Sequence, residues 1–194
     1  MALHDHAKPG PGRRCALDVR QGDRVLIVIS GLPGTGKTAV AAALAARRGA
    51  THLSIDPIED ALLGAGLPRC WETGVAAYEA ARVMAEQNLA LGRSVVADAV
   101  NDSEPARDTW RKAAANAGAD LVFVLLTLHD ADEHRRRLGD RVRHLTHVSE
   151  PSWGDVLAGA AAYAPWPEGA CLRVAAEPTV DEVVLELVDR LPSS

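Results

Sequence analysis

Short apolar runs alternate with longer amphipathic stretches along this chain. Five runs are rich in Val, Ile and Leu, which is typical of buried strands, and they cover residues 24–30, 51–55, 94–97, 121–128 and 171–175. The stretches between and after them predict helices over residues 38–48, 58–63, 72–91, 105–117, 131–138, 153–163 and 179–191.

In two of these helices the apolar positions also predict the buried face. In the longest helix, 72–91, the residues expected to face inward are Val75, Tyr78, Ala81, Val83 and Leu89. In the last helix, 179–191, the residues expected on one side are Val180, Val183, Val184, Leu187 and Val188.

Strands that alternate with helices indicate an α/β fold. We expect a five-stranded, mainly parallel sheet with helices on both faces. Ligands of such sheets bind beyond the carboxyl ends of the strands. The residues that directly follow each predicted strand are therefore the first candidates for function.

The first strand is followed by a complete phosphate-binding motif, G-x-x-x-x-G-K-[ST], at Gly31-Leu32-Pro33-Gly34-Thr35-Gly36-Lys37-Thr38. The glycines let backbone N–H groups point inward at phosphate oxygens, and the next helix adds its positive dipole end. Lys37 would reach the outer phosphates of ATP, and the Thr38 hydroxyl would ligate Mg²⁺. All eight residues are thus candidate nucleotide-binding residues.

Two acids follow the second and third predicted strands. Asp98 occupies the position of an acid that holds Mg²⁺ directly or through water, although it could be an ordinary strand-end residue. Asp56 could accept the proton of a hydroxyl aimed at the γ-phosphate, or it could only cap the turn before Pro57. The residue after Asp98 is Ala99 rather than a water-activating Glu, which favours transfer to an organic acceptor over hydrolysis.

A run of arginines at residues 135–143 follows the fourth predicted strand, where P-loop kinases carry a lid. Arginines that close on the γ-phosphate would stabilise the charge of the transferring group. On a continuous helix Arg137 and Arg141 are i, i+4 neighbours and could face one ligand. A solvated basic face is the alternative interpretation.

Composition and charge limit the remaining classes of function. The 194 residues suffice for one domain with a sizeable core, and 47% of them are hydrophobic, so a globular fold is expected. We interpret residues 1–22 as a mobile tail, residues 23–194 as the domain and the protein as cytoplasmic, because the polar N-terminus lacks an apolar signal core. A net charge of -5 argues weakly against general nucleic-acid binding, and the three cysteines lack metal-type spacing.

These motifs carry a resemblance to the small P-loop kinases, the group containing polynucleotide kinases, zeta toxins, chloramphenicol phosphotransferase and gluconate kinase. It covers most of residues 24–191 and rests on the loop 31–38, Asp56, the segment 95–101 and the arginines at 135–143. The segment from Val95 through Arg107 and Trp110 to 121–128 is most similar to the kinase domain of bacteriophage polynucleotide kinase.

The resemblance implies a sheet order of 2-3-1-4-5 and a role for each candidate. Asp56 would be the general base, Asp98 an acid near Mg²⁺ or substrate, and Arg141 the lid arginine. One position departs from the pattern. Polynucleotide kinases carry an Arg three residues after the base, whereas this chain has Glu59, and an acid is poorly suited to a nucleic-acid phosphate.

The sequence therefore predicts an ATP- and Mg²⁺-dependent kinase that phosphorylates a hydroxyl of a small molecule, with Lys37, Asp56, Arg137 and Arg141 as catalytic residues and Thr38 and Asp98 at the metal. Two alternatives stay open: a polynucleotide 5′-hydroxyl kinase-like enzyme, and a nucleotide-binding regulatory ATPase without an organic acceptor. Trp71, Tyr78 and Trp153 could wall a pocket, but aromatic residues at such spacings are more often core.

Overall fold

The computed structural model describes residues 24–192, so the N-terminal segment interpreted above as a tail lies outside the described residues. Over this range the chain forms five strands, β1 (Val25–Ser30), β2 (Thr51–Ser54), β3 (Val95–Asp98), β4 (Asp120–Thr127) and β5 (Leu172–Ala175). Seven helices accompany them, α1 (Lys37–Arg48), α2 (Ile55–Gly64), α3 (Trp71–Ala90), α4 (Glu104–Ala117), α5 (Ala131–Asp140), α6 (Trp153–Ala162) and α7 (Val180–Arg190). The predicted α/β pattern is confirmed.

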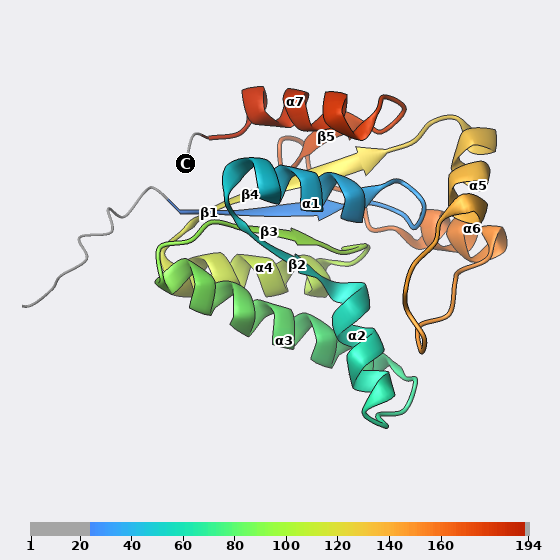
Figure 1. Ribbon diagram of the computed structural model, residues 1–194, viewed down its shortest axis with the longest axis horizontal. Helices are drawn as coiled ribbons and strands as arrows, with labels where there is room; N and C mark the ends of the chain where they lie inside the picture. The colour runs from blue at the N-terminus through green and yellow to red at the C-terminus, as the bar shows by residue number, and fades with distance from the viewer. Residues whose placement is uncertain (1–23, 193–194) are drawn as a thin grey trace, which may run out of the picture.

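The five strands form one parallel sheet in the order β2-β3-β1-β4-β5, as predicted (Figure 1). The register pairs Ile29 of β1 and Ser54 of β2 with the same residue, Asp98 at the end of β3. The carboxyl ends of these three strands therefore meet at one edge of the sheet. At this end of the molecule lie the loop after β1 and helices α2, α5 and α6 (Figure 1).

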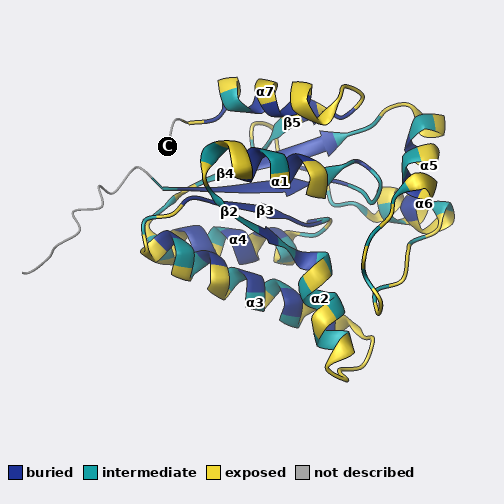
Figure 2. Cartoon of the chain, in the orientation of Figure 1, coloured by how far each residue is buried: buried dark blue, intermediate teal, exposed yellow. Residues whose placement is uncertain are grey.

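Helices cover both faces of the sheet, with α1 and α7 on one side and α3 and α4 on the other (Figure 1). The alternation of side chains along β1 explains this arrangement, because successive residues of a strand point to opposite faces. Val25, Ile27 and Ile29 pack with α1 and α7, whereas Leu26 and Val28 pack with α3 and α4. Strands β1 and β3 are buried throughout, the edge strands β2 and β5 are partly exposed, and the outer helix faces are exposed (Figure 2).

The buried face of α3 agrees with the prediction at Ala81 and Leu89 and differs from it at the two valines. Its buried residues recur at every fourth position, and they are Thr73, Ala77, Ala81, Ala85 and Leu89. Val75 and Val83, which were expected to face inward, are 39% and 40% exposed. Small side chains let this helix lie close to the sheet, and the larger valines fall outside that stripe. In α7 the predicted Val183, Val184 and Leu187 are buried, while Val180 is exposed.

Two boundaries near the strand ends also differ from the prediction. Strand β2 ends at Ser54 and α2 begins at Ile55, so Asp56 lies in the first turn of a helix. Pro57 is tolerated there because N–H groups of a first turn have no partner within the helix. Helix α5 continues through Gly139 to Asp140, and Arg141 follows in an extended conformation. Among the described residues no helix is long and apolar enough to cross a membrane.

Candidate functional site

The loop between β1 and α1 has the backbone that a phosphate-binding loop requires. Gly31, Gly34 and Gly36 have φ values of 145°, 88° and 89°, which L-residues with side chains rarely adopt. A Cβ on Gly31 would also lie 2.6 Å from the carbonyl oxygen of Leu126 on β4. The loop therefore depends on glycine both for its shape and for its close approach to the sheet.

Lys37 and Thr38 lie at the start of α1, directly after this loop. Lys37 Nζ donates a hydrogen bond to the Leu32 carbonyl oxygen at 2.9 Å, so the lysine reaches back across the loop. Desolvation of its ammonium lowers the pKa of Lys37 to about 8, although the charges of Asp98 and Asp56 oppose this shift. The lysine thus places an ammonium group, whose pKa is lowered by burial, beside the phosphate-binding backbone.

Thr38 and Asp98 form a pair of hard oxygen donors next to Lys37. The Thr38 hydroxyl is exposed and donates to Asp98 Oδ1 at 2.8 Å. Since this bond uses the hydroxyl proton, the lone pairs of Thr38 Oγ1 remain available to a cation. Mg²⁺ prefers a few such oxygens and completes its shell with waters and phosphate oxygens. The residues present fit Mg²⁺, and the structure brings together both predicted metal residues.

Two neighbours of Asp98 come from β2 and were missed by the sequence reasoning. His52 Nε2 lies 2.8 Å from Asp98 Oδ2, and Ser54 Oγ donates to Asp98 Oδ1 at 3.2 Å. His52 and Ser54 are two positions apart, so they share one face of the strand. That alternation of polar residues just before Asp56 is the signal that could have identified them.

Asp56 faces the segment that follows α5, residues 141–151, which we call the lid segment. Its carboxylate pairs with the guanidinium of Arg143, whose Nε also donates to Glu150 at 2.7 Å. Glu150 in turn accepts a hydrogen bond from Arg141 Nε at 2.6 Å. Asp56 is therefore held by a charge network across the site, and Arg143 and Glu150 join the candidates.

Two cavities meet at the same four side chains. The larger, about 480 Å³, runs from the loop along α1, and the smaller, about 190 Å³, lies between the loop, Val100 and the lid segment. Both cavities are lined by Lys37, Asp56, Arg141 and Arg143. These four residues consequently stand at the junction between the two cavities.

Arg137 lines the larger cavity but is engaged away from the junction. Its Nη1 donates to the Ala176 carbonyl oxygen at 2.5 Å and its Nη2 to that of Glu177 at 3.1 Å. Glu133 accepts a further hydrogen bond from Arg137 Nε at 2.6 Å. Arg137 thus fixes the loop between β5 and α7, whereas Arg141 stands beside Lys37.

The lid segment is fastened to α2 at the far side of Asp56. One carboxylate oxygen of Asp60 accepts hydrogen bonds from the backbone N–H groups of Thr146, His147 and Val148 at 3.0, 2.6 and 2.8 Å. These bonds lower the pKa of Asp60, with the bond from Val148 contributing most. The lid segment is therefore tied to α2 one turn after Asp56, whose side chain stays 40% exposed.

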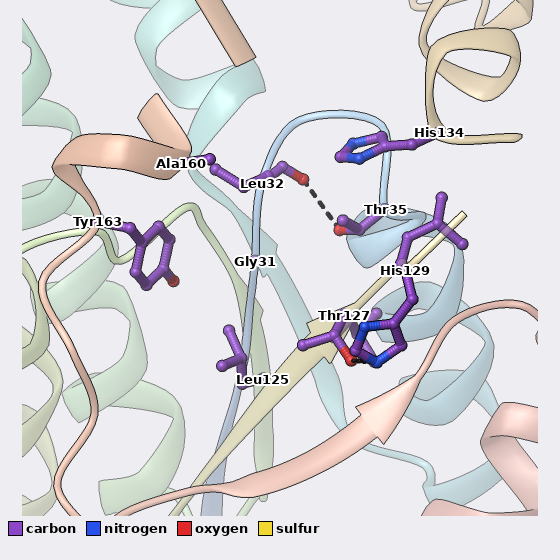
Figure 3. Close-up of a pocket in the computed structure, with 11 residues that line it drawn as sticks. Gly31, Leu32, Thr35, Leu125, Thr127, His129, His134, Ala160 and Tyr163 are labelled. Carbon is purple, nitrogen blue, oxygen red and sulfur yellow. Dashed lines mark hydrogen bonds between the residues drawn. The ribbon is translucent and has the colours of Figure 1, made fainter. Parts of the chain in front are cut away.

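A third cavity of about 260 Å³ lies on the other side of the loop, between Leu32, the end of β4 and α6 (Figure 3). His134 of α5 is buried at its edge and donates from Nε2 to the Pro33 carbonyl oxygen at 2.7 Å. A Cβ on Gly34 would lie 3.1 Å from the same imidazole. His134 therefore links α5, the helix that precedes the lid segment, to the phosphate-binding loop.

Of the aromatic residues, Trp110 and Tyr78 pack beneath the site, whereas Trp71 lies on the surface. Asn101, buried with φ 53°, accepts a hydrogen bond from Trp110 Nε1 at 2.8 Å and donates to Ser30 Oγ at 2.9 Å. The Tyr78 hydroxyl oxygen accepts a hydrogen bond from the Asn101 backbone N–H at 3.3 Å. Trp110 and Tyr78 thus brace the strand ends beneath the site. Trp71 is 78% exposed and belongs to neither the core nor a described cavity wall.

Comparison with known proteins agrees with this geometry. A family model described as an AAA domain (AAA_33) matches residues 26–163. No curated protein matches the chain.

Solved structures with the same fold include a kinase-like protein from Chloroflexus aurantiacus J-10-fl, with a TM-score of 0.70 and 20% identity, covering 88% of this chain and 100% of that one. A gluconokinase from Sinorhizobium meliloti 1021 has a TM-score of 0.61 and 21% identity, covering 86% and 91%. The APS kinase of Mycobacterium tuberculosis, solved with AMPPNP and APS, has a TM-score of 0.61 and 22% identity, covering 87% and 97%. These similarities show the fold of a kinase-like P-loop domain.

Proposed function

Because the chain belongs to this AAA domain family, we propose that it is an ATP- and Mg²⁺-dependent kinase that phosphorylates a hydroxyl group of a small molecule. One observation carries the proposal: Lys37, Asp56, Arg141 and Arg143 line both the larger and the smaller cavity. Phosphoryl transfer needs such a junction, where a donor and an acceptor meet in line. We take the domain to extend over residues 23–194, since β5 completes the sheet and α7 covers one of its faces beyond the family match.

The larger cavity supports the binding of the nucleotide. The loop 31–38 presents backbone N–H groups, and Lys37 reaches the outer phosphates from the start of α1. Thr38 and Asp98 would hold Mg²⁺, and a bound Mg²⁺ neutralises charge on the β- and γ-phosphates. Arg137 holds the loop after β5 at the edge of the same cavity.

The smaller cavity supports the binding of the acceptor. In the proposed reaction the acceptor hydroxyl oxygen forms a bond to the γ-phosphorus, and the bond to the β–γ bridging oxygen breaks to release ADP. The hydroxyl proton passes to the carboxylate of Asp56, which acts as the general base. Arg141 stabilises charge on the transferring group, and Arg143 orients Asp56 through their ion pair.

A volume of about 190 Å³ under a fastened lid segment favours a compact acceptor over a polynucleotide chain. Glu59 adds to this preference, because it places a second carboxyl group within electrostatic reach of Asp56, the proposed base. An acidic surrounding of this kind repels a phosphate backbone.

The proposal is tested by a screen of hydroxyl compounds in which ADP release is measured above the acceptor-free rate. Stimulation by a small hydroxyl compound, with a phosphorylated product detected by mass spectrometry, is the expected result. Stimulation only by oligonucleotides with a 5′-hydroxyl would instead identify a polynucleotide kinase. Slow hydrolysis without stimulation, together with nucleotide-dependent binding of a partner protein, would instead identify a regulatory ATPase.

A further inference from the structure

We propose that His52 is a positioning residue for the metal-binding hydroxyl of Thr38, and that it acts through Asp98. The three side chains form a chain of hydrogen bonds, with His52 Nε2 2.8 Å from Asp98 Oδ2 and Thr38 Oγ1 2.8 Å from Asp98 Oδ1. The inference rests on the proposed function only in assuming that Mg²⁺ and nucleotide bind at the loop 31–38.

Asp98 is an almost fully enclosed carboxylate, with 4% of its side chain exposed. A buried carboxylate is costly unless its oxygens accept hydrogen bonds. Oδ1 accepts hydrogen bonds from Thr38 and, at 3.2 Å, from Ser54. Within the described part of the chain, the hydrogen-bond partner of Oδ2 is His52. The imidazole therefore fixes the rotation of the carboxylate about its Cβ–Cγ bond.

This rotation decides where the Thr38 hydroxyl points. While Oδ1 accepts the Thr38 proton, the lone pairs of Oγ1 face away from Asp98 and are available to the metal. Both carboxylate oxygens accept hydrogen bonds from protein donors, so the orientation of Asp98 is set before a metal binds. Partners of this kind behind a ligand typically contribute about 10- to 100-fold to metal affinity or activity.

The position of His52 in the fold does not suggest a role in core packing. It lies on β2, one of the two edge strands of the sheet, and its side chain is 27% exposed, so it is not a core residue. The register pairs it with Val96, two positions before Asp98, and its ring reaches along the strands to the carboxylate. A histidine that merely filled space at this edge would not need that contact.

The test compares His52→Leu with His52→Gln. Leucine removes the donor at similar bulk, whereas the glutamine side-chain amide reaches about as far as imidazole Nε2 and can restore the bond. Binding of a non-hydrolysable ATP analogue is measured by isothermal titration, once with Mg²⁺ and once with a chelator. We expect His52→Leu to reduce the gain in affinity on adding Mg²⁺ by about 10-fold or more, to leave metal-free binding unchanged, and His52→Gln to recover most of the gain.

A second pair of variants makes the test specific to Asp98. In an Asp98→Ala background, His52→Leu should have no further effect on the Mg²⁺-dependent gain. The proposal is overturned if His52→Leu keeps the wild-type gain, if it weakens metal-free binding equally, or if its effect persists without Asp98. Failure of the proposed kinase activity would look different, since Mg²⁺-dependent nucleotide binding would persist while no hydroxyl compound accepted a phosphoryl group.

Discussion

The two halves of the site are built in different ways. The phosphate half consists of contiguous backbone, from β1 through the loop 31–38 into α1, and it rests on buried strands. The acceptor half consists of charged side chains from α2 and the lid segment, which are far apart in the sequence and partly exposed. In the proposed function, phosphate binding is accordingly assigned to the backbone of the loop, and acceptor selection to the ion pairs between Asp56 and the lid segment.

Removing the lysine of the phosphate half should have the largest effect. Lys37→Ala should reduce phosphoryl transfer to the assay background and weaken Mg·ATP binding, because the site loses its cation for the outer phosphates. The fold should survive, which a thermal unfolding curve would check. Wild-type turnover by this variant would show that the loop is not a phosphate site.

Substitutions at the junction between the two halves should change mainly the turnover number, kcat. Arg141→Ala should lower kcat by about 10²-fold, and more than it raises KM for ATP, because the contact strengthens as charge develops on the transferring group. Arg137→Ala should mainly raise KM for ATP, because Arg137 holds carbonyl groups of the loop after β5. Steady-state kinetics of both variants separate these roles, and a larger loss of kcat in Arg137→Ala would contradict them.

A substitution that releases the lid segment should affect the acceptor half and leave nucleotide binding by the phosphate half unchanged. Asp60→Ala removes the acceptor of three backbone N–H groups of the lid segment, so water should enter more readily. We expect ATP hydrolysis without acceptor to rise several-fold, KM for the acceptor to rise, and nucleotide affinity to stay constant. An Asp60→Ala variant with equally altered nucleotide affinity would show that the two halves are not separable.

A smaller effect is expected from pH. The pKa of Lys37 is lowered to about 8 in the nucleotide-free protein, and phosphates should raise it again by stabilising the ammonium. Nucleotide affinity should therefore decline as pH rises above about 8, with uptake of a proton on binding. Titration calorimetry in buffers of different ionisation enthalpy measures this uptake, and Lys37→Arg, which stays charged, is the control. Constant affinity up to pH 10 would contradict this account of Lys37.

The phosphate half could be predicted from the sequence because its determinants are local. Eight consecutive residues specify the loop, and the apolar run before Asp98 identifies the strand that delivers it. The buried face of α3 was predicted only in part: Ala81 and Leu89 are buried as expected, but Val75 and Val83 are exposed because small residues are the ones that pack closely against the sheet. The only sequence signal for His52 and Ser54 is the alternation of polar residues along β2, since their partner, Asp98, lies on another strand.

The acceptor half could be predicted only in part. Asp56 was found from its position after β2, but its partner Arg143 is separated from it by 87 positions, and nothing local specifies that pairing. The end of α5 decides which arginine faces the junction, and Gly139 made that end ambiguous in the sequence. The fastening of the lid segment by Asp60 uses backbone N–H groups, which leave no trace in the pattern of side chains.

The central claim is that Asp56 serves transfer and not nucleotide binding, and Asp56→Asn tests it most directly. The variant keeps the size of the side chain but removes the base and its charge. An ATP analogue should bind with unchanged or slightly higher affinity by isothermal titration, since a negative charge near the phosphates is lost. Turnover with the acceptor found in the screen should fall by ~10²–10⁴-fold. A variant that binds nucleotide normally and still phosphorylates the acceptor at the wild-type rate would contradict the account.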